Sequence, residues 1–217
     1  QPGADDNASA IAVLIELAAL LGNLDVPPPV DLVAYTLEEP PFFGTEQMGS
    51  AKHAESLAGQ AGNVQGIIVL EMVGYFNVKW GSQAYPAPLL YLMYPSRGNF
   101  IGVVSKWDQG DWIKTVKVAM KGTTDLPVYS MRAPAALPGI DFSDHRNYWP
   151  HGITSLMVTD TAFYRNKAYH SVDDTPDRLD YGRMAKVTIA VFNALESISR
   201  VEAPQVPMTE NGGRTNH

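Results

Sequence analysis

Four apolar residues stand in succession at Ile67-Ile68-Val69-Leu70, and three of them are β-branched. A strand with one face in water alternates apolar and polar residues, whereas a continuous apolar run suits a strand that is covered on both faces, as in parallel sheets. We therefore predict a buried strand over residues 64–73, and a sheet that carries helices on both of its faces.

Strand-like and helix-like stretches alternate along the chain. Further strands are predicted over residues 30–37, 99–105 and 154–159, with another that begins at Val128. Helical spacing of apolar residues predicts helices over residues 11–21, 45–59, 111–121 and 175–200. The alternation predicts an α/β fold, namely a three-layer α/β/α sandwich with a mostly parallel mixed sheet. Residues 1–200 are expected to form one domain, and the polar residues 201–217 a flexible tail.

Residues 75–97 interrupt this alternation. They are rich in Tyr, Pro and Gly and show no clear period. We interpret them as an irregular excursion over one face of the domain, which could form the wall of a pocket.

Charge and composition exclude several classes of function. The net charge is −7 and the pI about 5.1, so a basic surface that neutralises phosphates is absent and nucleic acid is not an expected partner. There is no cysteine, which excludes disulfides and zinc–thiolate sites. No apolar run is long enough to span a bilayer, so a membrane is not an expected partner either. Any metal must be held by His, Asp and Glu.

Two adjacent glutamates, Glu38 and Glu39, follow the predicted strand over residues 30–37. Neighbouring side chains at a strand end point in opposite directions, so one can hold a cation while the other accepts a proton. An isolated Glu-Glu pair is more often a solvated acidic turn. Glu71 lies near the end of the predicted strand over residues 64–73, and His170 lies in the loop after the strand over residues 154–159. Ligands in such folds bind at the carboxyl ends of the strands. All four side chains could therefore converge on one sheet edge.

The chain also contains five short motifs in a fixed order. They are Pro2-Gly3-Ala4-Asp5-Asp6-Asn7-Ala8-Ser9, then Glu38-Glu39 with Gly44 and Gly49-Ser50, then Glu71, then Ser143-Asp144-His145, then Tyr169-His170-Ser171-Val172-Asp173-Asp174-Thr175. Each motif alone is weak, but five in this order make a chance match improbable. The series resembles the co-catalytic zinc exopeptidases of the bacterial leucyl aminopeptidase and aminopeptidase Y family (metallopeptidase family twenty-eight), from Pro2 to about Leu195.

The resemblance implies a role for each acidic position. Asp6 would bridge two zinc ions, and Glu38 would be the general base that deprotonates the water bound to them. Glu39 and His170 would complete the protein ligands of one ion, and Glu71 would bind the other. Two such ions lower the pKa of a shared water toward ~7 and polarise the scissile carbonyl.

The resemblance also implies neighbours of the metal site. Asp5 would shape the turn that carries Asp6. Asp144 and His145 would lie behind the ligands or in the pocket, and Tyr164 and Arg165 would contact the substrate.

Relatives carry one more ligand, a histidine in a His-x-Asp motif upstream of the first turn, which this sequence lacks. We therefore expect an N-terminally truncated catalytic domain with one complete zinc site, formed by Asp6, Glu39 and His170. The second ion would keep Asp6 and Glu71, unless His53 or His145 is recruited. Missing strands would leave a sheet edge open, from which we expect a homo-oligomer or a separate N-terminal segment.

Several functions fit this resemblance. The leading hypothesis is a zinc aminopeptidase that acts on peptides. One alternative is a single-zinc acyltransferase similar to glutaminyl cyclase, and another is a non-catalytic, peptidase-like binding domain. Relatives are often secreted or periplasmic, which implies such a location here, while a cytoplasmic location stays open.

Overall fold

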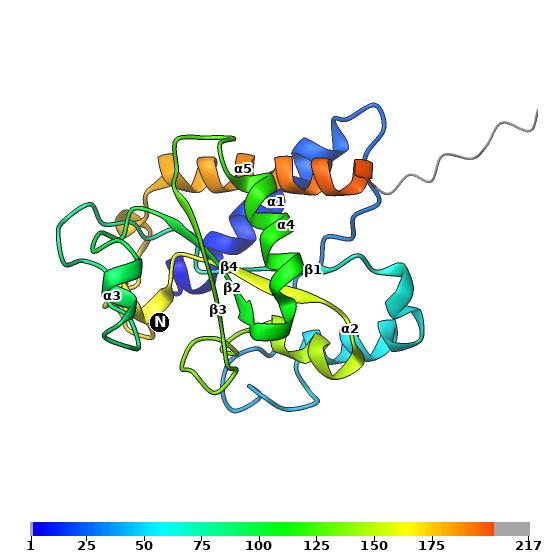
Figure 1. Cartoon of the computed structure of the whole chain (residues 1–217), viewed down its shortest axis with the longest axis horizontal. Coiled ribbons are helices and arrows are strands. Elements are labelled where there is room, and N and C mark those ends of the chain that lie inside the picture. Colours follow the sequence, from blue (N-terminus) through cyan, green and yellow to red (C-terminus); the bar gives the residue numbers. More distant parts are fainter. Residues whose placement is uncertain (1, 202–217) are drawn as a thin grey trace, which may run out of the picture.

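A computed structural model describes residues 2–201 and shows an α/β fold built on one mixed sheet (Figure 1). The helices are α1 (Ala10–Gly22), α2 (Gly49–Leu57), α3 (Leu90–Met93), α4 (Gly110–Met120) and α5 (Tyr181–Val201). The strands are β1 (Ile67–Glu71), β2 (Ile101–Lys106), β3 (Val128–Ala133) and β4 (Ser155–Thr159). The tail predicted for residues 201–217 lies, apart from Val201, outside the described residues.

The sheet has the strand order β1-β4-β2-β3. β1 pairs with β4 and β2 pairs with β3 in parallel, whereas β2 and β4 are antiparallel. The carboxyl ends of β1 and β4 therefore share one edge of the sheet with the beginning of β2, where Gly102 lies opposite Thr159. This edge carries the candidate site.

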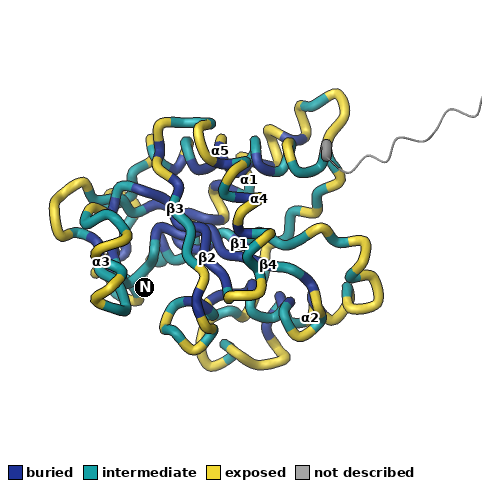
Figure 2. The backbone as a smooth tube through the Cα atoms, viewed as in Figure 1, coloured by how far each residue is buried: buried dark blue, intermediate teal, exposed yellow. Residues whose placement is uncertain are grey.

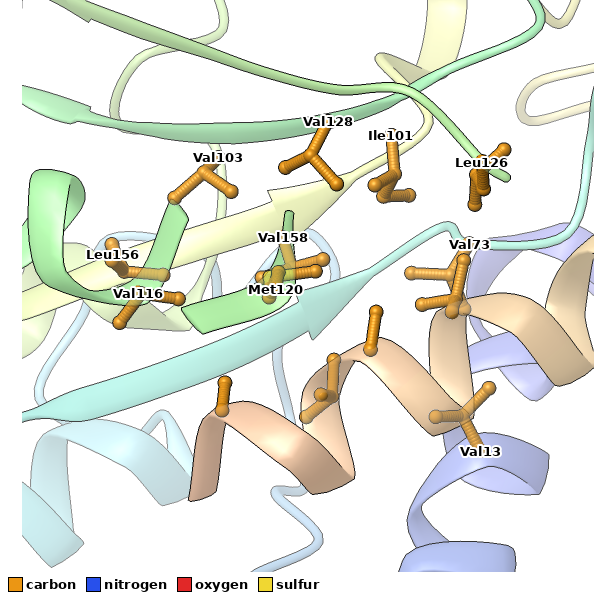
Figure 3. Packing of buried hydrophobic residues seen from close by; sticks show 14 of the residues in the cluster. Val13, Val73, Ile101, Val103, Val116, Met120, Leu126, Val128, Leu156 and Val158 are labelled. Carbon is orange, nitrogen blue, oxygen red and sulfur yellow. The ribbon is translucent and has the colours of Figure 1, made fainter. Parts of the chain in front are cut away.

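One face of the sheet packs against α1, α4 and α5, and these elements enclose the main hydrophobic core (Figure 3). Each helix buries one stripe of side chains at helical spacing. The buried residues are Val13, Leu17 and Leu21 of α1, Ile113, Val116 and Met120 of α4, and Val187, Val191 and Ala194 of α5. The strands at the centre are accordingly the most continuously buried part of the backbone (Figure 2).

The opposite face is covered by α2, by the 3-10 helix Asp144–His151 and by the loop before it. In Figure 1, α5 and α2 lie on opposite sides of the sheet. A smaller cluster of Val104, Ala133, Ile140 and Met157 fills part of this face. The predicted order of layers is thus confirmed, with shorter and less regular elements in the third layer.

The strand predicted over residues 30–37 does not form. A strand requires a neighbour within hydrogen-bonding distance, but a groove of about 860 Å³ separates residues 29–35 from β1. The backbone there makes one hydrogen bond that holds it to α2, from the Gly49 N–H to the Thr36 carbonyl at 2.8 Å.

The last helix begins later than predicted. Residues Pro176–Arg178 form a separate 3-10 turn, and α5 begins at Tyr181. The Asp180 carboxylate accepts a hydrogen bond from the Arg183 N–H at 2.9 Å, so Asp180 caps the helix. The second helix is also shorter than predicted, because α2 ends at Leu57 and continues as the 3-10 helix Ala58–Asn63.

Residues 75–97 form the predicted excursion, in which α3 is one short helical turn (Figure 1). The isolated antiparallel pairing of Asn77 with Gly98 holds the beginning of the excursion against its end, just before β2. No helix within residues 2–201 is both long and apolar enough to cross a membrane.

Candidate metal centre

Asp6 lies in the irregular helical turn Ala4–Ser9 that leads into α1. Its own φ and ψ, −108° and 89°, are not helical, and this conformation turns its carboxylate away from the helix. Gly3 is required for the turn, because its φ is +66° and a Cβ there would lie 2.7 Å from the Asp6 carbonyl oxygen. The Asp174 carboxylate, which is distant in sequence, accepts a hydrogen bond from the Asp6 N–H at 3.0 Å and fixes the turn.

His170 follows β4 and has a φ of +53°, which is uncommon for a residue with a side chain. Its ring stacks on Tyr169 with a centroid distance of 3.8 Å. Its Nε2 lies 3.1 Å from Asp6 Oδ2 and 3.4 Å from Glu39 Oε2. One ligand atom from each of these three residues lies within 4.8 Å of the others. Among residues 2–201, these three form the only group of His, Asp and Glu side chains that are close enough together to hold a metal ion.

The electrostatics of this cluster favour a cation. Burial and then the charge of Glu39 raise the pKa of Asp6 to about 6, while His170 opposes the shift. Two carboxylates are therefore held closer than their charges favour. A divalent ion would relieve that repulsion, and two carboxylate oxygens with one imidazole nitrogen are ligands that suit zinc.

Glu38 lies beside the cluster and faces the same groove. Burial, followed by the charges of Asp144, Glu39 and Asp6, raises its pKa to about 8. The adjacent glutamates thus differ, since the side chain of Glu39 is 49% exposed within the ligand group and Glu38 is only partly exposed. The division between Glu39 as a ligand and Glu38 as a proton acceptor stays a prediction.

Glu71 ends β1 and is buried next to the cluster rather than within it. Its Oε2 accepts hydrogen bonds from Ser143 Oγ at 2.7 Å and Asn7 Nδ2 at 3.3 Å. Burial and then the charge of Glu38 raise its pKa well above the usual range. The assignment of Glu71 to a second ion stays a prediction.

Asp5 belongs to a buried network directly behind Asp6. Its carboxylate accepts the Gly74 N–H at 3.0 Å and Asn166 Nδ2 at 2.9 Å, and it shares a hydrogen bond with Asp160. Asp160 is fully buried and accepts two backbone N–H groups. Sequence reasoning placed Asp5 but missed Asp160 and Asn166. The position of Asp160 directly after a strand was the signal that could have identified it.

The Ser143-Asp144-His145 motif divides between two environments. Asp144 accepts a hydrogen bond from Ser50 Oγ, and burial raises its pKa to about 6. His145 is completely buried, its Nε2 donates to the Ile140 carbonyl at 2.8 Å, and burial lowers its pKa to about 4. His145 is therefore a core residue, which excludes it as a substitute ligand, while its predicted position behind the ligands or in the pocket stays a prediction.

His53 is not recruited either. Its Nδ1 lies 2.6 Å from the Tyr148 hydroxyl, which also bonds to Tyr35. This contact holds residues 30–37 against the third layer.

Tyr164 and Arg165 differ although they are adjacent. Tyr164 lines the cavity next to the metal centre, which is consistent with the predicted substrate contact. Arg165 is 2% exposed, its Nε donates to Gln83 Oε1 at 2.8 Å, and its guanidinium lies over Phe100. The prediction of a substrate contact for Arg165 is wrong, because this side chain is enclosed by other parts of the protein.

Residues 1–195 match the family model described as Peptidase family M28. A protein of Escherichia coli (strain K12) described as uncharacterized protein YfbL is 52% identical over 194 residues, which are 89% of this chain and 59% of YfbL.

Solved structures show the same fold at low identity. The Legionella pneumophila LapA aminopeptidase is 20% identical with a TM-score of 0.66, and the match covers 92% of this chain and 48% of LapA. BSAP, a zinc aminopeptidase from Bacillus subtilis, is 20% identical with a TM-score of 0.64, over 90% of this chain and 42% of BSAP. The chain thus spans about half the length of these proteins.

Proposed function

Since this chain belongs to peptidase family M28, we propose that it is the catalytic part of a metal-dependent exopeptidase, and specifically of a zinc aminopeptidase that acts on peptides. The observation that carries the proposal is the approach of Asp6, Glu39 and His170 within 4.8 Å, with Glu38 beside them. The aminopeptidases named above support it as structural neighbours.

In this proposal, Asp6, Glu39 and His170 hold the ion. A zinc ion bound there would act as a Lewis acid and lower the pKa of water to about 7. Glu38 accepts the proton that the attacking water loses and later gives it to the leaving amine. A carboxyl group whose pKa lies near neutrality serves best for taking up and returning a proton, and burial moves Glu38 toward that range.

The charge of the site supports an aminopeptidase rather than a carboxypeptidase. Asp6, Glu38 and Glu39 line one groove, and Glu71 is buried beside them. Such a site attracts the positive α-ammonium group at the N-terminus of a peptide and repels a C-terminal carboxylate.

The variant Glu38→Ala tests the proposal. We expect kcat for peptide hydrolysis to fall by roughly 10²- to 10⁴-fold, while zinc content, measured by mass spectrometry, is unchanged. Glu46→Ala, an exposed glutamate in the same loop, is the matched control. Persisting hydrolysis in Glu38→Ala with zinc retained would show that the mechanism is wrong, and no hydrolysis by the zinc-loaded parent chain would refute the function.

A further inference from the structure

The segment that carries Glu38 and Glu39 has little support of its own. Residues 30–37 pair with no strand of the described chain, and Leu37, directly before the two glutamates, has a φ of +59°. A residue with a Cβ seldom adopts this left-handed conformation. The Leu37 side chain is 46% exposed, so its own packing does not impose the conformation. Such a turn persists only where neighbouring parts of the structure hold it.

The first attachment of this turn is to α2. The Gly49 N–H donates to the Thr36 carbonyl at 2.8 Å. A Cβ at Gly49 would lie 2.8 Å from the Thr36 nitrogen and 3.0 Å from its carbonyl oxygen, so the helix can come this close only with glycine. One hydrogen bond fixes a point on the chain but not its direction. A second attachment is needed to orient the turn.

The Tyr35 hydroxyl provides the second attachment. It hydrogen-bonds to the Tyr148 hydroxyl, and His53 Nδ1 lies 2.6 Å from the Tyr148 oxygen and 3.4 Å from the Tyr35 oxygen. Each hydroxyl proton has an acceptor when Tyr35 donates to Tyr148 and Tyr148 donates to His53 Nδ1. Burial raises the pKa of both phenols, so both keep the protons that this arrangement requires.

Tyr148 is a rigid point of attachment. It is fully buried and packs with Ala54 of α2 and with Ile153. It belongs to the 3-10 helix Asp144–His151, and the charge of Asp144 at the start of that helix adds to the effect of burial on the pKa of Glu38. One element of the third layer therefore holds the chain before Glu38 and also acts on Glu38 itself.

We propose that Tyr148 and His53 are positioning residues for the reaction. Through the Tyr35 hydroxyl they hold the turn at Leu37, and the turn in its place sets where Glu38 and Glu39 lie. The inference rests on the proposed function, because it takes Glu38 as the proton acceptor. The alternative is that these side chains only stabilise the third layer, in which case their loss would leave the metal site unchanged.

Tyr35→Phe removes the hydroxyl and keeps the ring. In the zinc-loaded chain we expect kcat for L-leucine p-nitroanilide to fall by roughly 10- to 100-fold with KM nearly unchanged, because displacement of a reacting group slows the reaction. Zinc affinity, measured by competition with a chromogenic chelator, should fall roughly tenfold, because Glu39 lies on the same turn. Tyr181→Phe, which removes a hydroxyl bonded to the Pro176 carbonyl at 3.0 Å, is the matched control. Unchanged kcat or unchanged zinc affinity in folded Tyr35→Phe would overturn the inference.

Hydrogen exchange in the metal-free chain tests the attachment without any activity. Peptides that cover residues 42–49 include the Gly49 amide, whose acceptor is the Thr36 carbonyl. Their deuterium uptake, followed by mass spectrometry, should rise in Tyr35→Phe and stay the same in Tyr181→Phe. Uptake by residues 67–71 of β1 should not change, which separates a local release from a general loss of stability.

The two proposals fail in different ways. If the zinc-loaded parent chain hydrolyses no anilide, the proposed function is wrong, while exchange and zinc affinity still decide whether the attachment positions the turn. Equal uptake by residues 42–49 in the parent chain and in Tyr35→Phe would refute the attachment, whatever the parent chain hydrolyses.

Two substitutions of His53 separate its hydrogen bond from its packing. Asparagine places an acceptor oxygen close to the position of Nδ1, whereas alanine leaves the Tyr148 hydroxyl without this acceptor. We expect His53→Asn to keep kcat within about threefold of the parent chain and His53→Ala to lower it by roughly tenfold or more. Equal losses in the two variants would contradict the role of His53.

A double-mutant cycle tests whether the attachment acts on the Leu37 turn. Glycine adopts a positive φ without strain, so in Leu37→Gly the turn depends less on being held. The fold-loss of kcat caused by Tyr35→Phe should therefore be at least about threefold smaller in the Leu37→Gly background than in the parent chain. The same fold-loss in both backgrounds would show that the hydroxyl does not act through this turn.

Discussion

Asp5 and Asp6 are neighbours in the chain but lie in opposite environments. Asp5 is fully buried, and its carboxylate accepts hydrogen bonds from Gly74 and Asn166. Asp6 opens toward the groove, where its neighbours are Glu39 and His170. The backbone N–H groups of both aspartates are held by the single carboxylate of Asp174.

The difference shows how identical residues acquire different functions. A carboxylate that the protein supplies with N–H donors is already satisfied and stabilises the fold. A carboxylate placed against other carboxylates needs a positive charge from elsewhere. The acidic region thus has a buried half, formed by Asp5 and Asp160, and a metal-binding half, formed by the candidate ligands Asp6, Glu39 and His170. Substitutions in the buried half should lower the stability of the fold, and substitutions in the metal-binding half should weaken metal binding.

The largest effect is expected from the buried half. Asp160→Ala leaves the N–H groups of Tyr75 and Ala162 without their acceptor, which we expect to lower the free energy of unfolding by about 3–5 kcal/mol. Urea denaturation of the metal-free chain measures this. Asp173→Ala, an exposed aspartate in the same loop, should change stability by less than about 0.5 kcal/mol. Equal effects of the two substitutions would remove the distinction between the halves.

The metal-binding half should show the opposite response. His170→Ala removes a ligand, and we expect zinc affinity to fall more than roughly 100-fold while the unfolding transition of the metal-free chain stays nearly the same. Competition with a chromogenic chelator gives the affinity, and His151→Ala, outside the cluster, is the control. Retained affinity in His170→Ala would exclude this residue as a ligand.

pH sharpens the same comparison in the metal-free chain. The pKa of Glu38 is about 8 in the folded state against an ordinary value of 4.5, so the folded chain keeps this proton where the unfolded chain has lost it. The contribution of Glu38 to stability is therefore fully present below pH 4.5 and is lost as pH rises toward 8.

Glu38→Gln should flatten the dependence of stability on pH over this window. The change in slope should not exceed ~1.4 kcal/mol per pH unit, the value for one proton, and solvent screening of the partly exposed Glu38 should narrow the pH window. The comparison with the parent chain isolates the effect of Glu38 from that of its acidic neighbours Asp6, Glu39 and Asp144. Parallel curves, measured by urea denaturation from pH 4 to 9, would contradict the shift.

The smallest effect is expected at Glu71, which is buried next to the candidate ligands. Ser143→Ala removes the 2.7 Å hydrogen bond to Glu71, and we expect a loss of about 1–2 kcal/mol in the free energy of unfolding. Ser56→Ala, whose hydroxyl bonds to a carbonyl on the exposed side of α2, is the control and should lose less. A gain in stability would mean that Glu71 is better accommodated without this donor.

Sequence patterns located the parts of the fold that depend on local periodicity. The apolar run at Ile67–Leu70 and the helical stripes predicted the layers, because burial follows from spacing alone. The strand over residues 30–37 was predicted wrongly, since pairing requires a neighbour that spacing does not reveal. The ordered motifs pointed to Asp6, Glu39 and His170, which the structure places at the same edge of the sheet.

Other parts of the site were not readable from patterns. Asp160 and Asn166 were missed because their roles depend on partners far away in the sequence: Asp160 accepts the Tyr75 N–H, and Asn166 donates to the Asp5 carboxylate. Arg165 was assigned to the substrate from the family resemblance, whereas its environment of Phe100 and Gln83 is a property of the folded chain.

The hydrogen bonds from Asp5 to Asp174 span 169 residues of sequence. During synthesis, the turn that carries Asp6 therefore remains without its fixing partner until almost the whole domain has been made. Contacts of such long range form late, because the chain must first lose the entropy of closing the loop between them. The candidate metal site therefore depends on complete folding. In a nascent or proteolytically opened chain its ligands are not held together, and metal binding should coincide with the last cooperative step of folding.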